Sequence, residues 1–66
     1  MAKLLLDAIE TLPLRYRVIV KLRYDTQMSF REIGRALSIL EATAKTYFYR
    51  ARKQLRTLLG SEFAYY

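Results

Sequence analysis

Basic side chains are concentrated in the C-terminal third of the chain, where they point to phosphate as the group bound. From Ala42 to Ser61 the sequence holds five basic residues and no acidic one. Lysine and arginine at this density are typical of surfaces that bind nucleic acid, because they neutralise charges along a phosphate backbone. A solvated helix face is the alternative. The five basic residues are Lys45, Arg50, Arg52, Lys53 and Arg56.

The whole chain has the same bias. Its 66 residues include 12 Lys and Arg against 6 Asp and Glu, which gives a net charge of +6. Such a positive field on a small protein favours a polyanionic partner, nucleic acid before a membrane surface. No segment approaches the roughly 20 apolar residues that a membrane span needs, and residues 1–6 are too short for a secretory leader. We therefore expect a cytoplasmic protein with no membrane partner.

Catalytic chemistry has few residues to use. The chain has no cysteine and no histidine, which removes the usual thiolate and imidazole groups of nucleophiles, general bases and metal sites. Its two glycines cannot build a glycine-rich phosphate loop. The six carboxylates form no obvious catalytic pair or oxygen cage; they are Asp7, Glu10, Asp25, Glu32, Glu41 and Glu62. The sequence therefore predicts that the protein is not an enzyme and holds no metal or cofactor.

The spacing of apolar residues indicates the elements that must carry the basic residues. A first helix is expected from about residue 3 to residue 12, because its apolar residues recur on one stripe and Pro13 then ends it. The stripe consists of Leu4, Leu5, Ala8, Ile9 and Leu12.

Residues 13–24 are ambiguous. Apolar and basic residues alternate along this segment, which is a strand pattern, and only Ile19 breaks the alternation. An isolated strand would leave its backbone groups unpaired, and no other segment reads as a partner strand. We therefore favour a helix that starts at Pro13, stacks Leu14, Val18 and Leu22 on one face and is covered on two sides by neighbouring elements.

A short helix and a long helix follow. Ser29 and Glu32 have the spacing of a capping box, so a helix is expected over residues 30–37, with Phe30, Ile33, Gly34 and Leu37 on its inner face. The last helix is expected from about residue 40 to 59, and Gly60 is a suitable stop. Its apolar sector is Leu40, Ala44, Tyr47, Phe48, Ala51, Leu55 and Leu58.

These elements predict an all-α fold, a small bundle of about four helices containing a helix-turn-helix. We expect one domain over residues 1–66. Its core lies in residues 12–59, and the tail over residues 60–66 is loosely held. In that motif the second helix enters the major groove and its first residues meet base edges. The helical wheel places Ala42, Lys45, Thr46 and Tyr49 on the outer face of this helix. Tyr49 is expected to stack on a base or sugar, or else to lie over lysine stems.

Several runs, in this order and spacing, carry a family resemblance. They are Leu12-Pro13, Arg17-Val18-Ile19, Leu22-Arg23-Tyr24, Ser29 to Gly34, Leu37, Thr43 to Thr46 and Arg50 to Arg56. Over residues 12–59 the chain resembles region four of bacterial sigma factors, most closely the extracytoplasmic-function type. The resemblance implies binding of double-stranded promoter DNA at the −35 element, as the C-terminal domain of a factor that directs transcription initiation. It also implies docking on the flap of the RNA polymerase β subunit and occlusion by an anti-sigma factor.

The resemblance also implies roles for individual residues. Carried over by position, the base-reading residues are Glu41, Ala42, Lys45 and Thr46, to which the outer-face position of Tyr49 adds a fifth. Backbone contacts fall on Ser29, Arg31 and Arg50. Arg35 joins this set because it projects from the same side of the short helix as Arg31, where both residues either hold phosphate or solvate the helix.

The chain departs from the family pattern around the turn. Ser38 stands where glycine is usual, and Leu40 replaces the Ser or Thr that caps the recognition helix. Ala44 stands where Val or Ile is usual, and Tyr47 where Arg is common. A missing cap costs about 1 kcal/mol unless a neighbour or bound DNA satisfies the free amides.

Two alternatives from other classes stay open on sequence grounds. One is a protein-interaction module, because both ends of the chain are rich in apolar residues: Leu4, Leu5, Leu58, Leu59, Phe63, Tyr65 and Tyr66. It would dock on the β-flap or an anti-sigma factor. A phage-type transcription activator built on the same helical module is also compatible. An amphipathic membrane-surface helix is disfavoured, because the apolar stripe of the basic helix is needed for the core.

Overall fold

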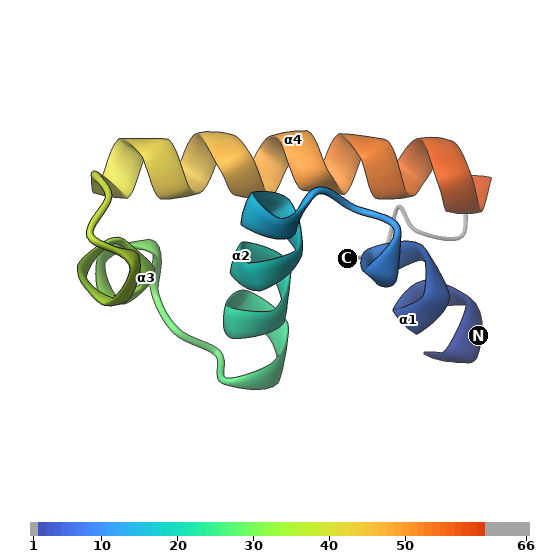
Figure 1. Cartoon of the computed structure of the whole chain (residues 1–66), viewed down its shortest axis with the longest axis horizontal. Coiled ribbons are helices and arrows are strands. Elements are labelled where there is room, and N and C mark those ends of the chain that lie inside the picture. Colours follow the sequence, from blue (N-terminus) through green and yellow to red (C-terminus); the bar gives the residue numbers. More distant parts are fainter. Residues whose placement is uncertain (1, 61–66) are drawn as a thin grey trace.

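The protein is an assembly of four helices in which one long helix supports the other three. The computed structural model describes residues 2–60, with side chains from Leu6 onward. The helices are α1 (Ala2–Glu10), α2 (Leu14–Asp25), α3 (Phe30–Leu37) and α4 (Glu41–Leu59). Figure 1 shows α4 along the length of the molecule, with α3 beneath its first turns, α2 beneath its middle and α1 beneath its last turns. The predicted all-α fold with four helices is confirmed for this part of the chain.

The core lies between α4 and the three helices beneath it. One cluster joins α1, α2 and α4 and contains Ala8, Ile9, Leu12, Tyr16, Val20, Ala51 and Leu55. A second joins α2, α3 and α4 and contains Ile19, Ile33, Ala44 and Phe48. Each fully buried aliphatic side chain stabilises the fold by about 1.5–3 kcal/mol. Because every cluster uses the same side of α4, the opposite side of that helix remains uncovered.

Helix α2 confirms the helical interpretation of residues 13–24 and its coverage on two sides, but the face of Leu14, Val18 and Leu22 is not the most buried one. The buried residues are Tyr16, Ile19 and Val20, whereas Leu14 is 65% exposed. Val18 and Leu22 are half-buried. The reason is the position of α2 between α1 and α3, with its N-terminal end against α4 (Figure 1): Val20 packs in the cluster shared with α1, and Ile19 packs in the cluster shared with α3.

Helix α1 ends at Glu10, two residues before the predicted end. The Thr11 hydroxyl donates a hydrogen bond to the Ala8 carbonyl at 2.6 Å, and Leu12 is buried after the chain has left the helix. The Glu10 carboxylate pairs with Arg17 at 3.2 Å and with Lys21 at 2.6 Å. These two ion pairs join α1 to α2 at an exposed position.

Helix α3 begins as predicted. The Ser29 hydroxyl accepts a hydrogen bond from the Glu32 N–H at 3.1 Å, and the Glu32 carboxylate accepts one from the Ser29 N–H at 2.9 Å. Both donors of a capping box are therefore satisfied. The predicted inner face is also confirmed, since Ile33 and Gly34 are buried and Phe30 and Leu37 are half-buried.

The turn between α3 and α4 is short and tightly folded. Ser38 has φ 57° and ψ 43°, the left-handed conformation that favours glycine. The Ile39 N–H donates to the Gly34 carbonyl at 2.9 Å. A Cβ added at Gly34 would stand 2.8 Å from the Ile39 carbonyl oxygen, so only glycine permits this approach of the turn to α3.

Helix α4 runs over nearly the predicted range, but two of its predicted apolar contacts were wrong. Leu40 is 74% exposed because it precedes the helix in an extended conformation, with φ −67° and ψ 148°. Leu58 is 57% exposed, because Leu59 is the residue that packs on the first cluster. Gly60 ends the helix as predicted, with φ 72° and its N–H donating to the Arg56 carbonyl.

Some sequence predictions fall on residues that lie outside the described range. They are the side chains of Leu4 and Leu5 and the tail over residues 61–66. Within the described part of the chain, none of the helices has the length and apolar character needed to span a bilayer.

Candidate nucleic-acid interface

The predicted base-reading residues lie together on the uncovered side of α4. All five are exposed: Glu41, Ala42, Lys45, Thr46 and Tyr49. They recur at intervals of one, three and four residues, which places them along one broad face over the first turns. The buried residues of the same helix, from Ala44 to Leu55, lie opposite. The structure therefore brings the predicted set together and leaves it accessible.

Two members of this face have defined hydrogen-bonding capacity. The Thr46 hydroxyl donates to the Ala42 carbonyl at 3.0 Å, so its oxygen remains available as an acceptor. Lys45 is a donor without a carboxylate partner in the part of the chain that the structure describes, where both ion pairs belong to Glu10. Together these groups suit the donor and acceptor pattern of base edges in a major groove.

Tyr49 has a structural role as well as an exposed surface. It is 54% exposed. Its ring centroid lies 5.5 Å from that of Phe48 and 6.2 Å from that of Phe30. The Arg23 guanidinium lies over the Phe30 ring, 4.8 Å from its centroid. The tyrosine therefore packs on an aromatic cluster that joins α3 to α4.

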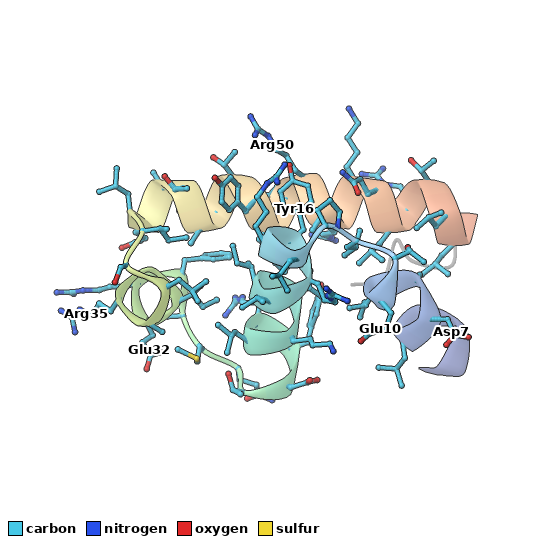
Figure 2. All side chains as sticks on the ribbon, viewed as in Figure 1. Asp7, Glu10, Tyr16, Glu32, Arg35 and Arg50 are labelled. Atoms are coloured by element: carbon cyan, nitrogen blue, oxygen red, sulfur yellow. The ribbon has the colours of Figure 1, made fainter. Side chains whose placement is uncertain are left out.

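The predicted backbone contacts on α3 lie beside the start of α4. Ser29, Arg31 and Arg35 are exposed. The Ser29 hydroxyl is occupied by the capping box. Figure 2 shows Arg35 pointing away from the body of the protein, at the end that carries the first turn of α4. Arg31 is one helical turn earlier, so the two guanidiniums share the outer side of α3.

Glu32 is the acidic exception on this side. Hydrogen bonds from the Ser29 backbone and hydroxyl hold the pKa of the Glu32 carboxyl below its ordinary value, and the Arg35 charge adds to the effect. The capping box therefore fixes this carboxylate in its charged form at the N-terminus of α3. This negative charge interacts favourably with the positive end of the α3 helix dipole.

The N-terminus of α4 has no comparable partner. Leu40 occupies the capping position and no side chain accepts from the first amides of the helix. The first free N–H groups belong to Glu41, Ala42 and Thr43, since the Ala44 N–H already donates to the Leu40 carbonyl at 3.0 Å. The positive end of the helix dipole therefore opens on the same face as the base-reading residues.

The five basic residues of α4 do not form one uniform face. Arg52, Lys53 and Arg56 line a shallow groove of about 560 Å³ together with Tyr49 and Thr57. Arg50 is exposed on the other flank of the helix, beside Tyr16 of α2 (Figure 2). Of the four predicted backbone-contact residues, Arg50 is therefore the one that the structure separates from α3.

Sequence reasoning missed a cluster on that second flank. The Arg15 guanidinium lies 4.8 Å from the Tyr16 ring centroid and 6.0 Å from that of Tyr47. The two tyrosine rings are 5.7 Å apart. The only signal in the sequence was the adjacency of Arg15 and Tyr16, and the alternating pattern of residues 13–24 hid which of them faces α4.

A small apolar cleft opens beside this cluster. It has a volume of about 210 Å³ and lies where α2, the end of α3 and α4 meet. Its lining is Arg15, Val18, Ile19, Leu37, Ile39 and Tyr47. This cleft is separate from the base-reading face, so the protein offers one polar surface and one apolar surface for contacts.

The fold and this surface define a helix-turn-helix domain of the DNA-binding class. In the described residues there is no group of three or more His, Cys, Asp or Glu side chains that could hold a metal ion. What the surface offers is a long helix with an exposed, cationic outer face, a short capped helix behind it and a tight turn between them.

Comparison with known proteins places the chain in a family. Residues 2–55 match the family described as Sigma-70, region 4, and the chain belongs to it. The sequence is 38% identical over 55 residues to the RNA polymerase sigma factor FliA of Escherichia coli K12, covering 83% of this chain and 23% of that protein. It is 42% identical over 48 residues to the ECF RNA polymerase sigma factor SigW of Bacillus subtilis, covering 73% and 26%. No solved structure gave a significant match.

These matches confirm the resemblance stated from the sequence. The family is one of DNA-binding transcription factor domains and not of enzymes. The chain spans about a quarter of the length of the curated relatives it matches.

Proposed function

We propose that the chain is the −35-reading domain of an RNA polymerase sigma factor, acting on double-stranded promoter DNA in the cytoplasm. One observation carries this proposal: the side of α4 opposite the core is exposed, cationic and free of carboxylate partners within the described residues. Its family membership supplies the class of DNA. Initiation itself requires the remainder of a sigma factor, since the matched segment covers only 23% and 26% of the relatives.

The mechanism divides the contacts into two groups. Lys45 and Thr46 contact base edges and supply most of the discrimination, with each good contact worth about 1–3 kcal/mol. Glu41 accepts from cytosine N4, Ala42 permits close approach, and Tyr49 lies against the sugar or base at the edge of the groove. Ser29, Arg31, Arg35 and Arg50 hold phosphates, which fixes the register of the domain without reading sequence.

The uncapped start of α4 fits this division. Its free amides lie between the base-reading residues and α3, where a phosphate or a base oxygen can accept from them. The backbone N–H groups at the start of α4 that have no capping partner in the free protein would then be hydrogen-bonded in the complex. Ser38 and Gly34 contribute indirectly, because they fix the angle at which α4 leaves the turn.

In vitro selection from a random duplex library tests this proposal, followed by fluorescence anisotropy on the selected duplex and a scrambled one at two salt concentrations. We expect enrichment of one sequence, tighter binding of the selected duplex, and a steep loss of affinity in salt. A selection that enriches no sequence, with equal affinity for both duplexes, would contradict sequence reading by this domain.

A second contact is proposed for the apolar cleft. A cleft of about 210 Å³ lined mainly by Val18, Ile19, Leu37, Ile39 and Tyr47 accepts one or two apolar side chains of a protein partner. The family suggests the flap of the RNA polymerase β subunit as that partner, with an anti-sigma factor competing for it.

Val18→Asp tests this second contact, since Val18 is only half-buried and lines the cleft. We expect the variant to lose binding to an isolated β-flap fragment while its affinity for the selected duplex is preserved. Leu14→Asp, on an exposed position of the same helix, is the matched control. Equal flap binding by both variants and the wild type would show that the cleft is not the docking site.

A further inference from the structure

Tyr16 is a buried residue whose polar end lies between two cations. It is 5% exposed and packs in the first core cluster, with its ring 5.7 Å from that of Tyr47. The Arg15 guanidinium covers the Tyr16 ring at 4.8 Å. Figure 2 shows Tyr16 and Arg50 next to one another where α2 meets the middle of α4. The cluster therefore joins a helix outside the helix-turn-helix to the recognition helix.

The electrostatics of this cluster are unbalanced. Burial raises the pKa of the Tyr16 hydroxyl, but hydrogen bonding and charge from Arg15 and then Arg50 outweigh it, and the net shift is downward. Within the described residues the only carboxylate in an ion pair is Glu10, whose partners are Arg17 and Lys21. Arg15 and Arg50 therefore place two positive charges around one phenol oxygen with no ion-paired counter-charge, and the approach of an anion would relieve their repulsion.

We propose that Arg15 and Arg50 clamp one phosphate of the bound DNA, and that Tyr16 is the positioning residue that holds both guanidiniums. The guanidiniums are exposed and present planar donors suited to phosphate oxygens, while the tyrosine is anchored by its burial. This proposal rests on the proposed function, and it adds a contact from α2 to those of the helix-turn-helix.

The position of Arg50 favours a DNA phosphate over a carboxylate of a protein partner. Arg50 follows Thr46 by four residues, so it lies one turn further along the same side of α4. An anion bound at Arg50 is then next to the DNA major groove that Thr46 enters in the proposed complex. Arg15 stands in the first turn of α2, where the dipole of that helix also favours negative charge.

The experiment compares DNA binding by Tyr16→Phe, Arg15→Gln and Arg50→Gln with a matched control. Lys21→Gln is that control, because it removes the same charge from α2 while its partner Glu10 keeps Arg17. Anisotropy against the selected and scrambled duplexes is measured at several salt concentrations. A second set of duplexes carries a neutral methylphosphonate at one backbone position at a time, and thermal denaturation reports the folding of each variant.

We expect Arg15→Gln and Arg50→Gln each to weaken both duplexes about tenfold, with the salt slope reduced by roughly one. Tyr16→Phe should weaken binding about threefold, because both guanidiniums remain but lose the tyrosine that holds them together. The decisive readout is the methylphosphonate series. The wild type should be sensitive at several backbone positions, and all three variants should lose sensitivity at one and the same position among them.

Three results would overturn the proposal. One is binding by Tyr16→Phe and both arginine variants that matches Lys21→Gln. Another is a methylphosphonate profile that the variants leave unchanged. The third is loss of affinity for a protein partner with DNA affinity intact, which would assign the site to a carboxylate. Because scrambled DNA carries the same phosphates, the clamp can be confirmed even if the selection finds no preferred sequence, so the two proposals fail separately.

Discussion

The two helices of the helix-turn-helix begin in opposite ways. Helix α3 starts with a complete capping box, in which Ser29 and Glu32 satisfy each other's backbone donors at 3.1 and 2.9 Å. Helix α4 starts at Leu40, which is 74% exposed and offers no acceptor. The first helix is thus defined by its own side chains, whereas the second is placed by the turn before it and leaves its amides free for a ligand.

The largest effect should come from breaking the turn. Gly34→Ala adds a Cβ that would stand 2.8 Å from the Ile39 carbonyl oxygen, a backbone atom that cannot move without shifting the start of α4. We expect a loss of about 2–3 kcal/mol in the free energy of unfolding, near the upper range for overpacking. Urea denaturation followed by circular dichroism measures it. Wild-type stability in this variant would show that the turn does not fix the placement of α4.

The next effect should come from removing the cap that α3 has. Ser29→Ala deletes the acceptor of the Glu32 N–H and should lower the free energy of unfolding by about 1 kcal/mol. The same denaturation experiment applies, with Ser38→Ala as a control for a serine that makes no capping contact through its side chain. Equal effects of the two substitutions would mean that the capping box adds nothing measurable.

A smaller effect of opposite sign should come from supplying the cap that α4 lacks. Leu40→Ser places an acceptor on an extended residue, with φ −67° and ψ 148°, and removes little buried surface. We expect stabilisation of up to about 1 kcal/mol. The affinity for DNA should not rise and should fall if the serine competes for the amides that bind the ligand. A gain in both stability and affinity would contradict the proposed role of the free amides.

The smallest effect should be the pH dependence of the α3 cap. The pKa of the Glu32 carboxyl is lowered by the Ser29 hydrogen bonds, so its stabilising contribution is present above the ordinary value of 4.5 and is lost as the pH falls below it. Glu32→Gln should therefore be less stable than the wild type at neutral pH and should approach it in acid. A difference that stays constant across this range would show that the charge of Glu32 is not involved.

Local sequence signals predicted most of this architecture. Helix α3 was expected over residues 30–37 and observed as Phe30–Leu37, because its capping box and its inner face are defined by residues of that one short segment. Helix α4 and its stop at Gly60 followed from the period of its apolar residues. The base-reading set could be placed on one exposed face for the same reason, since a helix wheel needs no tertiary information.

The errors arose where neighbours decide the outcome. Leu14 was expected to share an apolar face with Val18 and Leu22, and Tyr16 was given no role, because an alternating segment does not reveal which of its residues meet neighbouring helices. The cluster of Arg15, Tyr16 and Arg50 joins residues more than thirty positions apart in the sequence, so no local sequence pattern predicts it. Leu40 was misplaced because the exact start of a helix without a cap is set by the turn.

The central claim is that the outer face of α4 reads sequence while the flanking arginines hold the backbone. Anisotropy of Lys45→Ala and Arg50→Ala on the selected and scrambled duplexes tests it most directly. We predict that Lys45→Ala reduces the affinity ratio of the two duplexes by about 5- to 150-fold, equivalent to 1–3 kcal/mol. Arg50→Ala should weaken both duplexes alike and leave that ratio unchanged. Uniform loss of affinity in both variants would contradict this division of roles.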